Sequence, residues 1–462
     1  MRLARFFGPS AAFALLASET YLLLASYAIA LALVVKVDPA VFLMYNRGFL
    51  RLAILMATLL VGFYLLDMYD DIRVRSRVAL VQQVTLVFGV AFIIQALLNY
   101  VSRELLLPRW VMFVGSAIAG PAMFGWRILY SRFLDSPIYG ERVLFLGLSR
   151  LAQQIHQRMR EKPQLGMVPI GYVGEPEDNH CGIPAEEILG PVADLRRIVR
   201  EKRPDRIVVA LPERRRQLPQ AELLDFKFSG IIIQDGISAF EEVFERVPVC
   251  ELRPSQLIFS EMLGPRPGTV FFQSLYSTLL AAALLILSAP VSLLVALLVK
   301  FTSAGPVLFR QQRVGRHGRI FVLYKFRSMY ADAEARTGAV WATKDDPRIT
   351  PVGRWIRKYR LDELPQLVNV LKGDMVIVGP RPERPEFVEK LIEQIPFYRQ
   401  RLAVKPGLTG WAQINHKYGD TIEDAVTKLE YDLYYIRHLT PTLDAYIMLH
   451  TLKVILLGRG AQ

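Results

Sequence analysis

The segment SLYSTLLAAALLILSAPVSLLVALLVK, which runs from Ser274 to Lys300, decides the fold class because it is long, apolar and interrupted by a proline. It is long enough to cross roughly 30 Å of hydrocarbon. Arg266 precedes it and Arg310 follows it, so the positive-inside rule keeps both of its ends on the cytoplasmic side. Pro290 removes one helical hydrogen bond and clashes with the preceding turn, which allows a bend. The pattern predicts a re-entrant membrane helix over 274–300, with Ser288 and Pro290 at its hinge.

The same segment has an alternative interpretation as a plain transmembrane span that tolerates a proline. That path would place everything after Lys300 on the outer side of the membrane. The two interpretations therefore differ in the compartment that holds the last third of the chain.

Four further apolar runs lie upstream, near the N-terminus. They cover Phe13 to Val35, Leu52 to Leu66, Val78 to Ser102 and Trp110 to Trp126. At about 1.5 Å per residue most of them can cross the hydrocarbon core, the second only if Arg51 snorkels at its end. The first run is too long for a signal peptide and is followed by further spans. We predict a region of four transmembrane helices over residues 1–136, with both chain ends in the cytoplasm.

The composition is that of a membrane protein rather than of an ordinary soluble one. Of the 462 residues, 52% are hydrophobic, and the formal net charge is +13. In a membrane protein this charge favours anionic lipid or a phosphorylated substrate over nucleic acid, and basic and aromatic residues do not interleave as they would for RNA. The two cysteines, Cys181 and Cys250, fit a reducing compartment and offer no disulfide framework.

Residues 137–262 predict a small α/β domain, because short β-branched runs alternate there with stretches of helical spacing. The expected strands are Arg142 to Leu146, Ile207 to Ala210 and Ile231 to Gln234, and the expected helices are Leu151 to Arg160, Val192 to Glu201 and Gln220 to Phe228. Such alternation is typical of a parallel, Rossmann-like sheet.

The turn after the first of these strands keeps only part of a dinucleotide-binding fingerprint. Gly147 is present, but the other glycines of the G-x-G-x-x-G pattern are missing. Without them the backbone cannot approach a pyrophosphate closely. We therefore expect a structural or regulatory role for this domain and disfavour a sugar-nucleotide oxidoreductase, which bound NAD in the purified protein would support.

Residues 263–462 predict a compact, mainly helical domain that lies on the membrane, and its most informative motif is LDELPQ, from Leu361 to Gln366. A very basic stretch precedes the motif. Pro365 fits only near the first turn of a helix, so Asp362 and Glu363 lie where backbone N–H groups and the helix dipole favour anions. Two adjacent acids in such a place suit phosphate chemistry, but they also suit a simple helix cap.

Two other segments carry candidate ligand-binding residues. Lys325 and Arg327 follow an apolar run that reads as a short strand. Pro380 and Pro382 flank Arg381 and hold it in a stiff, extended turn. A guanidinium restrained in this way makes a good fork for phosphate, although each segment taken alone would be an ordinary basic surface.

Taken together, these motifs make the chain resemble the bacterial polyprenyl-phosphate sugar-1-phosphate transferases, the monotopic phosphoglycosyl transferases that start exopolysaccharide and O-antigen assembly. The matching segments begin at Gly305 (GPVLF), Lys325 (KFRSM), Leu361 (LDELPQ), Gly373 (GDM), Gly379 (GPRPE) and Pro406 (PGLTGWAQ). The first 262 residues resemble the larger members of the family in architecture only. The membrane break commonly reads Ser-Pro in the family, whereas an alanine separates the two residues here, so we expect the hinge to be displaced by one residue.

The resemblance implies a mechanism and a set of site residues. In the family the aspartate of the acid pair is a covalent nucleophile, so Asp362 would attack the sugar-bearing phosphorus of a UDP-sugar and expel UMP. Undecaprenyl phosphate would then accept the phosphosugar. The resemblance also implies catalytic Asp362 and Glu363, with Mg²⁺ on Glu363. The residues that it implies for substrate binding are Lys325, Arg327, Arg357, Pro380, Arg381, Pro382 and Asp432.

The implied partners are UDP-glucose or UDP-galactose, undecaprenyl phosphate and the lipid bilayer. Apart from the resemblance, we expect a homodimer through the Rossmann-like domain and no nucleic acid. The implied location is the bacterial inner membrane, as a multi-pass protein whose catalytic domain lies on the cytoplasmic face. An alternative from another class is a non-catalytic membrane scaffold or nucleotide sensor, in which the acids are caps and the basic loops hold lipid. The intact set of motifs argues against it.

Overall fold

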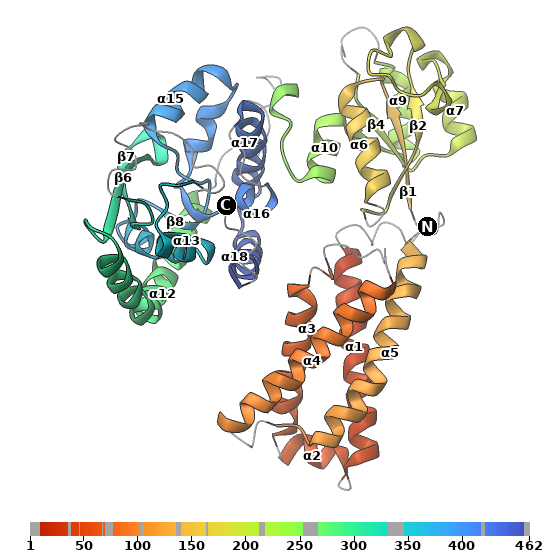
Figure 1. Cartoon of the computed structure of the whole chain (residues 1–462). Coiled ribbons are helices and arrows are strands. Elements are labelled where there is room, and N and C mark those ends of the chain that lie inside the picture. The colour runs from red at the N-terminus through yellow and green to blue at the C-terminus, as the bar shows by residue number, and fades with distance from the viewer. Residues whose placement is uncertain are drawn as a thin grey trace. The chain divides into compact units, whose positions relative to one another are not determined.

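The computed structural model divides into two compact units, Met1–Ala239 and Phe240–Gln462, each with hydrophobic clusters of its own (Figure 1). The structure describes residues 10–35, 38–45, 47–66, 68–69, 77–101, 106–134, 140–162, 165–211, 218–252, 267–330, 346–416 and 421–456. The predicted domain boundaries, between 136 and 137 and between 262 and 263, lie outside these residues.

The four predicted apolar runs form long helices in the first unit (Figure 1). These helices are α1 (Ser10–Val34), α3 (Gly48–Leu65), α4 (Arg77–Val101) and α5 (Arg109–Leu134). Each contains a stretch long and apolar enough to cross a membrane, which supports the expected membrane association. The short helix α2 (Pro39–Tyr45) was not predicted, because seven residues fall well below the length of a span.

A buried ion pair connects the first of these helices with the last. Glu19 of α1 is fully buried, and Arg127 of α5 donates to its two carboxylate oxygens from Nε at 2.6 Å and from Nη2 at 3.1 Å. The Tyr69 hydroxyl donates to the same carboxylate at 2.8 Å, and Arg127 also donates to the Met68 carbonyl at 2.7 Å. Because a buried charge without its partner is costly, this pair favours one register of α1 against α5.

The α/β domain follows, with a five-stranded sheet in the order β3-β2-β1-β4-β5, all of whose strand pairs are parallel. Its strands are β1 (Glu141–Leu146), β2 (Met167–Val173), β3 (Ile188–Gly190), β4 (Arg206–Val209) and β5 (Ile232–Asp235), and its helices are α6 (Arg150–Glu161), α7 (Leu195–Lys202) and α9 (Gln220–Phe228) (Figure 1). The predicted parallel sheet is therefore confirmed. The sequence pattern missed β2, which contains Pro169 and Gly171, and β3, which is only three residues long.

The glycine in the turn after β1 has a structural reason. Gly147 has a φ of 114°, and a Cβ there would lie 2.6 Å from the Ala210 carbonyl oxygen. Ser149 caps α6 by accepting a hydrogen bond from the Ala152 N–H at 3.2 Å. The close approach of β1 and β4 therefore requires glycine at this position whether or not a ligand binds.

The second unit is mainly helical, as predicted, with two small two-stranded sheets. The antiparallel pair is β6 (Leu308–Val314) with β7 (Ile320–Phe326), and the parallel pair is β8 (Val376–Val378) with β9 (Gly407–Thr409). Its helices include α12 (Pro267–Thr302), α13 (Pro351–Lys358), the 3-10 helix η9 (Leu361–Gln366), α14 (Leu367–Leu371), α15 (Pro385–Gln394), the 3-10 helix η10 (Tyr398–Ala403), α16 (Trp411–Asn415), α17 (Ile422–Arg437) and α18 (Pro441–Leu456). The boundary between the two units falls within the sequence of α10 (Gly236–Phe244).

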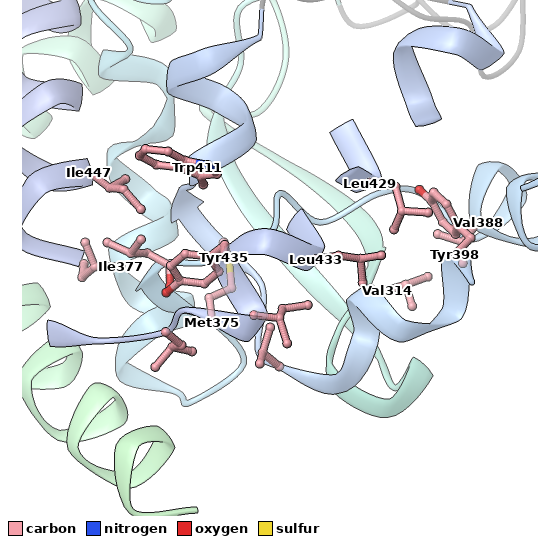
Figure 2. Packing of buried hydrophobic residues seen from close by; sticks show 14 of the residues in the cluster. Val314, Met375, Ile377, Val388, Tyr398, Trp411, Leu429, Leu433, Tyr435 and Ile447 are labelled. Carbon is pink, nitrogen blue, oxygen red and sulfur yellow. The ribbon is translucent and has the colours of Figure 1, made fainter. Parts of the chain in front are cut away.

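The main hydrophobic cluster of the second unit brings β8 together with α16, α17 and α18 (Figure 2). Ile377 of β8 packs in it with Leu433 and Tyr435 of α17, Trp411 of α16 and Ile447 of α18. Burial of each such side chain contributes about 1.5–3 kcal/mol to folding. Because β8 leads directly into the Gly379-Pro380-Arg381 loop, this cluster holds the base of that loop.

Helix α12 contains the apolar segment on which the fold class depends. It is one continuous helix of 36 residues that includes Ser288 and Pro290. Its buried residues fall into two groups, Gln273, Ser277 and Ala281 in the first half and Val295 and Val299 in the second. Between the groups, Ile286 and Leu287 are each 77% exposed. Both halves of α12 thus pack on the second unit, while Ile286 and Leu287 between them remain exposed.

Candidate active site

The acid pair lies inside a 3-10 helix rather than at the start of an α-helix. Asp362 and Glu363 belong to η9, and Arg360 precedes that helix in the left-handed region, with a φ of 52°. In this described segment the N-cap position is Arg360, which makes no side-chain capping hydrogen bond. The interpretation of Asp362 as an N-cap is therefore wrong, and capping does not explain why two acids are buried here.

Three cationic side chains lie close to the Glu363 carboxylate. Arg381 Nη2 lies 2.9 Å from Glu363 Oε1, and Lys325 Nζ lies 3.3 Å from the same oxygen. Arg360 Nη1 lies 3.5 Å from Glu363 Oε2. Burial alone would raise the pKa of Glu363, but the charges of Arg381, Lys325 and Arg360 outweigh it and hold this pKa well below its usual range. Glu363 is therefore a permanent anion.

Asp362 is next to Glu363 in the sequence but has a different environment. Among the residues that the structure describes, its carboxylate accepts no hydrogen bond. Burial and the negative charge of Glu363 raise its pKa to about 6, against the opposing charges of Lys325, Arg357 and Arg381. Asp362 is thus mostly ionised at neutral pH, poorly solvated and close to cations. These are the properties of a nucleophilic carboxylate.

The loop after β8 is held on both sides, and this restrains Arg381. Gly379 N–H donates to the Thr409 carbonyl at 2.8 Å, and Gly407 N–H donates to the Pro380 carbonyl at 2.9 Å. A Cβ at Gly379 would lie 2.7 Å from the Lys405 carbonyl oxygen, so only glycine allows the two segments to approach this closely. The prolines on either side of Arg381 add a fixed φ.

Asp432 acts on this loop through another residue. Its Oδ2 accepts from Arg401 Nη2 at 2.8 Å and from Arg401 Nε at 3.0 Å, and both side chains are buried. Arg401 Nη2 also donates to the Arg381 carbonyl at 3.0 Å, and Arg401 Nη1 donates to the Tyr398 hydroxyl at 2.7 Å. The structure therefore places Asp432 behind the loop, where it orients Arg401, which contacts the Arg381 backbone.

Arg327 hydrogen-bonds to the end of α12. Its Nη2 donates to the Ser303 carbonyl and to Ser303 Oγ, each at 2.7 Å, and approaches the Val299 carbonyl at 3.4 Å. These acceptors belong to the last turn of α12 and to the residue after it. Arg327 thus holds the end of the membrane helix, whereas Lys325, from the same strand, contacts Glu363.

The structure thus brings together Asp362, Glu363, Lys325, Arg357 and Arg381, and it adds Arg360 and Arg401, which the sequence did not single out. Arg360 directly precedes the acid motif, so its place in the basic stretch was a usable signal. Arg401 lies in a segment without any recognisable motif, and no feature of the sequence marks its contact with Asp432 or with the loop.

The acid pair is the candidate for binding Mg²⁺ in this site. Among the residues that the structure describes, no group of three or more His, Cys, Asp or Glu side chains could hold a metal ion by itself. Mg²⁺ in phosphoryl-transfer sites is usually held by one or two carboxylates together with substrate phosphates and water, and the pair fits that mode. The cations on Glu363 must then move or share its oxygens with the ion.

Comparison with known proteins gives two family matches. Residues 268–458 match the model described as bacterial sugar transferase, and residues 64–217 match a model described as CoA-binding domain. The first match covers α12 except for Pro267, and it covers every motif of the candidate site. The second covers much of the α/β domain and part of the helical region before it.

Several relatives match between about half and three quarters of this chain. The UDP-glucose:undecaprenyl-phosphate glucose-1-phosphate transferase of Escherichia coli K12 is 34% identical over 326 residues, which cover 68% of this chain and 67% of that protein. The undecaprenyl-phosphate glucose phosphotransferase of Komagataeibacter xylinus is 31% identical, with 76% and 66% covered. The UDP-N-acetylgalactosamine-undecaprenyl-phosphate N-acetylgalactosaminephosphotransferase of Aeromonas hydrophila is 44% identical, with 48% and 52% covered, so the chain matches only about half of that relative's length. The expected homodimer, the cytoplasmic face and the identity of the sugar stay predictions.

Proposed function

The chain belongs to the bacterial sugar transferase family, and on this premise we propose that it transfers a sugar-1-phosphate from a UDP-sugar to undecaprenyl phosphate with release of UMP. Such a reaction starts the assembly of an exopolysaccharide or an O-antigen. The observation that carries the proposal is Asp362, a buried carboxylate with a raised pKa beside an acid that is already neutralised by cations. The names of the relatives make glucose, galactose and N-acetylgalactosamine the first donors to test.

In the first step we assign the attack to Asp362. Its carboxylate oxygen bonds to the sugar-bearing phosphorus, the bond from that phosphorus to the bridging oxygen breaks, and UMP leaves with the bridging oxygen. Asp362 needs no general base because its carboxylate is the ionised form. Two anions must meet in this step, and Lys325, Arg357 and Arg381 lower the repulsion between them.

In the second step the phosphate oxygen of undecaprenyl phosphate attacks the same phosphorus. The bond to Asp362 breaks, the carboxylate is regenerated, and the product is a polyprenyl diphosphosugar. In both steps Glu363 would hold Mg²⁺, and the bound ion would supply positive charge to the reacting phosphates. Arg381 stays oriented through both steps by its backbone contact with Arg401.

The test of this function offers the purified full-length protein, in lipid nanodiscs, a panel of UDP-sugars with undecaprenyl phosphate and Mg²⁺, and follows UMP. UMP and a lipid-linked sugar should appear with at least one donor, and addition of EDTA should stop both. Absence of UMP with every sugar would favour the non-catalytic scaffold. UMP release that persists in EDTA would remove only the metal from the proposal.

The rate of UMP release in the first step should fall as the pH is lowered through about 6. The pKa of Asp362 is raised to about 6, so protonation below that pH removes the nucleophile, and the rate of UMP release should rise as the pH increases through 6. In a Glu363→Gln variant the neighbouring negative charge is lost, which should lower the pKa of Asp362 and move this fall in rate to lower pH, whatever the residual rate. If the pH at which the rate falls is the same in this variant, the charge of Glu363 does not raise the pKa of Asp362.

We further propose that α12 is re-entrant, as its sequence predicts, and that the catalytic unit is cytoplasmic. A straight helix of 36 residues would be about 54 Å long, so crossing the bilayer would place its two packed halves on opposite sides of the membrane. One compact unit covers both halves, and this supports a return to the same side. In a variant without Cys181 and Cys250, single cysteines at Gly268→Cys and Ala304→Cys should react with an impermeant maleimide from the same side. Reaction from opposite sides would establish a plain span.

A further inference from the structure

We propose that Asp444 of α18 is a positioning residue, which couples the membrane helix α12 to the loop that carries Arg381. The juxtaposition behind this proposal is a buried carboxylate on α18 with three neighbouring hydrogen-bond donors from α12 and α17. Two of these donors, Gln273 and Tyr435, also lie within hydrogen-bond distance of the last carbonyl of β8. The inference rests on the proposed function, because the loop matters as part of a phosphosugar transferase.

Asp444 is fully buried and is the common acceptor of the network. It accepts from Gln273 Nε2 at 2.9 Å and from the Tyr435 hydroxyl at 2.7 Å. The Tyr276 hydroxyl donates to it as well. Gln273 and Tyr276 belong to α12, whereas Tyr435 belongs to α17. One carboxylate on α18 therefore joins three helices.

The network continues to the strand below the loop. Gln273 Nε2 lies 3.2 Å from the Val378 carbonyl oxygen, and the Tyr435 hydroxyl lies 2.9 Å from the same oxygen. One turn further along α12, Ser277 Oγ accepts from the Ile377 N–H at 3.3 Å. Val378 is the last residue of β8, and only Gly379 and Pro380 separate it from Arg381. The donors of Asp444 thus reach the base of the Arg381 loop.

The chemistry of this network favours a carboxylate. Gln273 Nε2 and the Tyr276 hydroxyl donate to Asp444, and the single proton of the Tyr435 hydroxyl can go to Asp444 or to the Val378 carbonyl, so the partner of these groups must accept at least two hydrogen bonds. In the described part of the chain no cation pairs with Asp444. An uncompensated buried acid is costly, and an apolar residue of similar size would serve packing alone better. The acid is therefore better explained by what it positions than by stability.

The coupling has a mechanical consequence because α12 is held at both of its halves. The first half is held by Asp444 and Val378, and the end is held by Arg327 through Ser303. Each attachment lies next to a segment of the candidate site, the Arg381 loop in one case and the strand of Lys325 in the other. The position of α12 and the positions of these two site segments are thus fixed together.

The kinetic test uses the full chain in nanodiscs and measures UMP release without undecaprenyl phosphate. Tyr435→Phe removes one hydroxyl from the network and should lower kcat by about tenfold, the loss expected for one buried hydrogen bond. Asp444→Asn should lower it further, because its amide would face three donors. Tyr434→Phe, the same change one position earlier on α17, has no hydroxyl in this network and should leave kcat unchanged.

A double-mutant cycle with Arg381→Lys separates positioning from general damage. If the network acts through Arg381, Tyr435→Phe should lose most of its effect on kcat in that background. Equal effects in both backgrounds, or an unchanged kcat in the folded single variants, would overturn the proposal.

A ligand-free measurement makes the inference independent of the proposed reaction. Amide hydrogen exchange should become faster in Asp444→Asn and in Tyr435→Phe both in peptides around 273–281 and in peptides around 376–383, but not in Tyr434→Phe. Unchanged exchange at 376–383 would disprove the coupling even in an active enzyme. Faster exchange in both regions, in a protein that releases no UMP, would support the coupling and refute the proposed function.

Discussion

An Asp362→Asn variant should neither release UMP from a UDP-sugar nor acquire a phosphosugar on the protein. The wild-type chain, incubated with the donor in the absence of undecaprenyl phosphate, should gain the mass of one phosphosugar in intact-protein mass spectrometry. In the variant the amide oxygen is a poor nucleophile, so the rate should fall by roughly 10⁴-fold or more, as it does when other enzymes lose their nucleophile.

This variant tests chemistry rather than folding. Asparagine has nearly the shape of aspartate, and the substitution removes a like charge beside Glu363, so the thermal midpoint should not fall. Asp225→Asn, on an exposed face of the α/β domain, is the matched control and should keep full activity. A labelled protein or continued UMP release in Asp362→Asn would assign the nucleophile to another residue.

Asp432→Asn should give the largest loss of stability among single substitutions near the site. The change leaves the buried Arg401 guanidinium without its anionic partner, and breaking a buried pair in this way typically costs about 3–5 kcal/mol of unfolding free energy. The loss should be visible as a lower thermal midpoint in detergent. Because Arg401 also donates to the Arg381 carbonyl, kcat should fall in the molecules that remain folded.

A second acid on the same helix provides the control for this prediction. Glu430 is nearly buried on α17 and pairs with Arg246, away from the Arg381 loop. Burial raises the pKa of Glu430 to about 7, so near neutral pH it is already partly protonated and Glu430→Gln should be mild. If Asp432→Asn lowers the thermal midpoint and kcat no more than Glu430→Gln does, Asp432 does not position the loop through Arg401.

The membrane region shows which structural features local sequence patterns can predict. The long apolar runs predicted α1, α3, α4, α5 and α12, because spanning length is a property of contiguous sequence. The partner of Glu19 could not be predicted in the same way. Arg127 lies at the far end of the region in sequence, and only the antiparallel packing of α1 against α5 brings the two charges together.

In the α/β domain, too, local sequence patterns predicted only part of the structure. Strands with clean β-branched patterns were found, but β2 was missed because its proline and glycine are unfavourable in isolated strands. Its pairing with β1 supplies the hydrogen bonds and burial that outweigh this local preference.

The sequence by itself determined the membrane character of this protein, its parallel α/β domain and the ordered motifs that identify its family, because these depend on composition and on spacing along the chain. The tertiary structure alone decided how the charges are distributed. Lys325, Arg360 and Arg381 converge on Glu363, Asp362 keeps a raised pKa, Arg327 holds the end of α12, and Asp432 acts through Arg401. Ion pairs form between side chains that are neighbours in space, and a pKa depends on burial. Neither property exists until distant segments have packed.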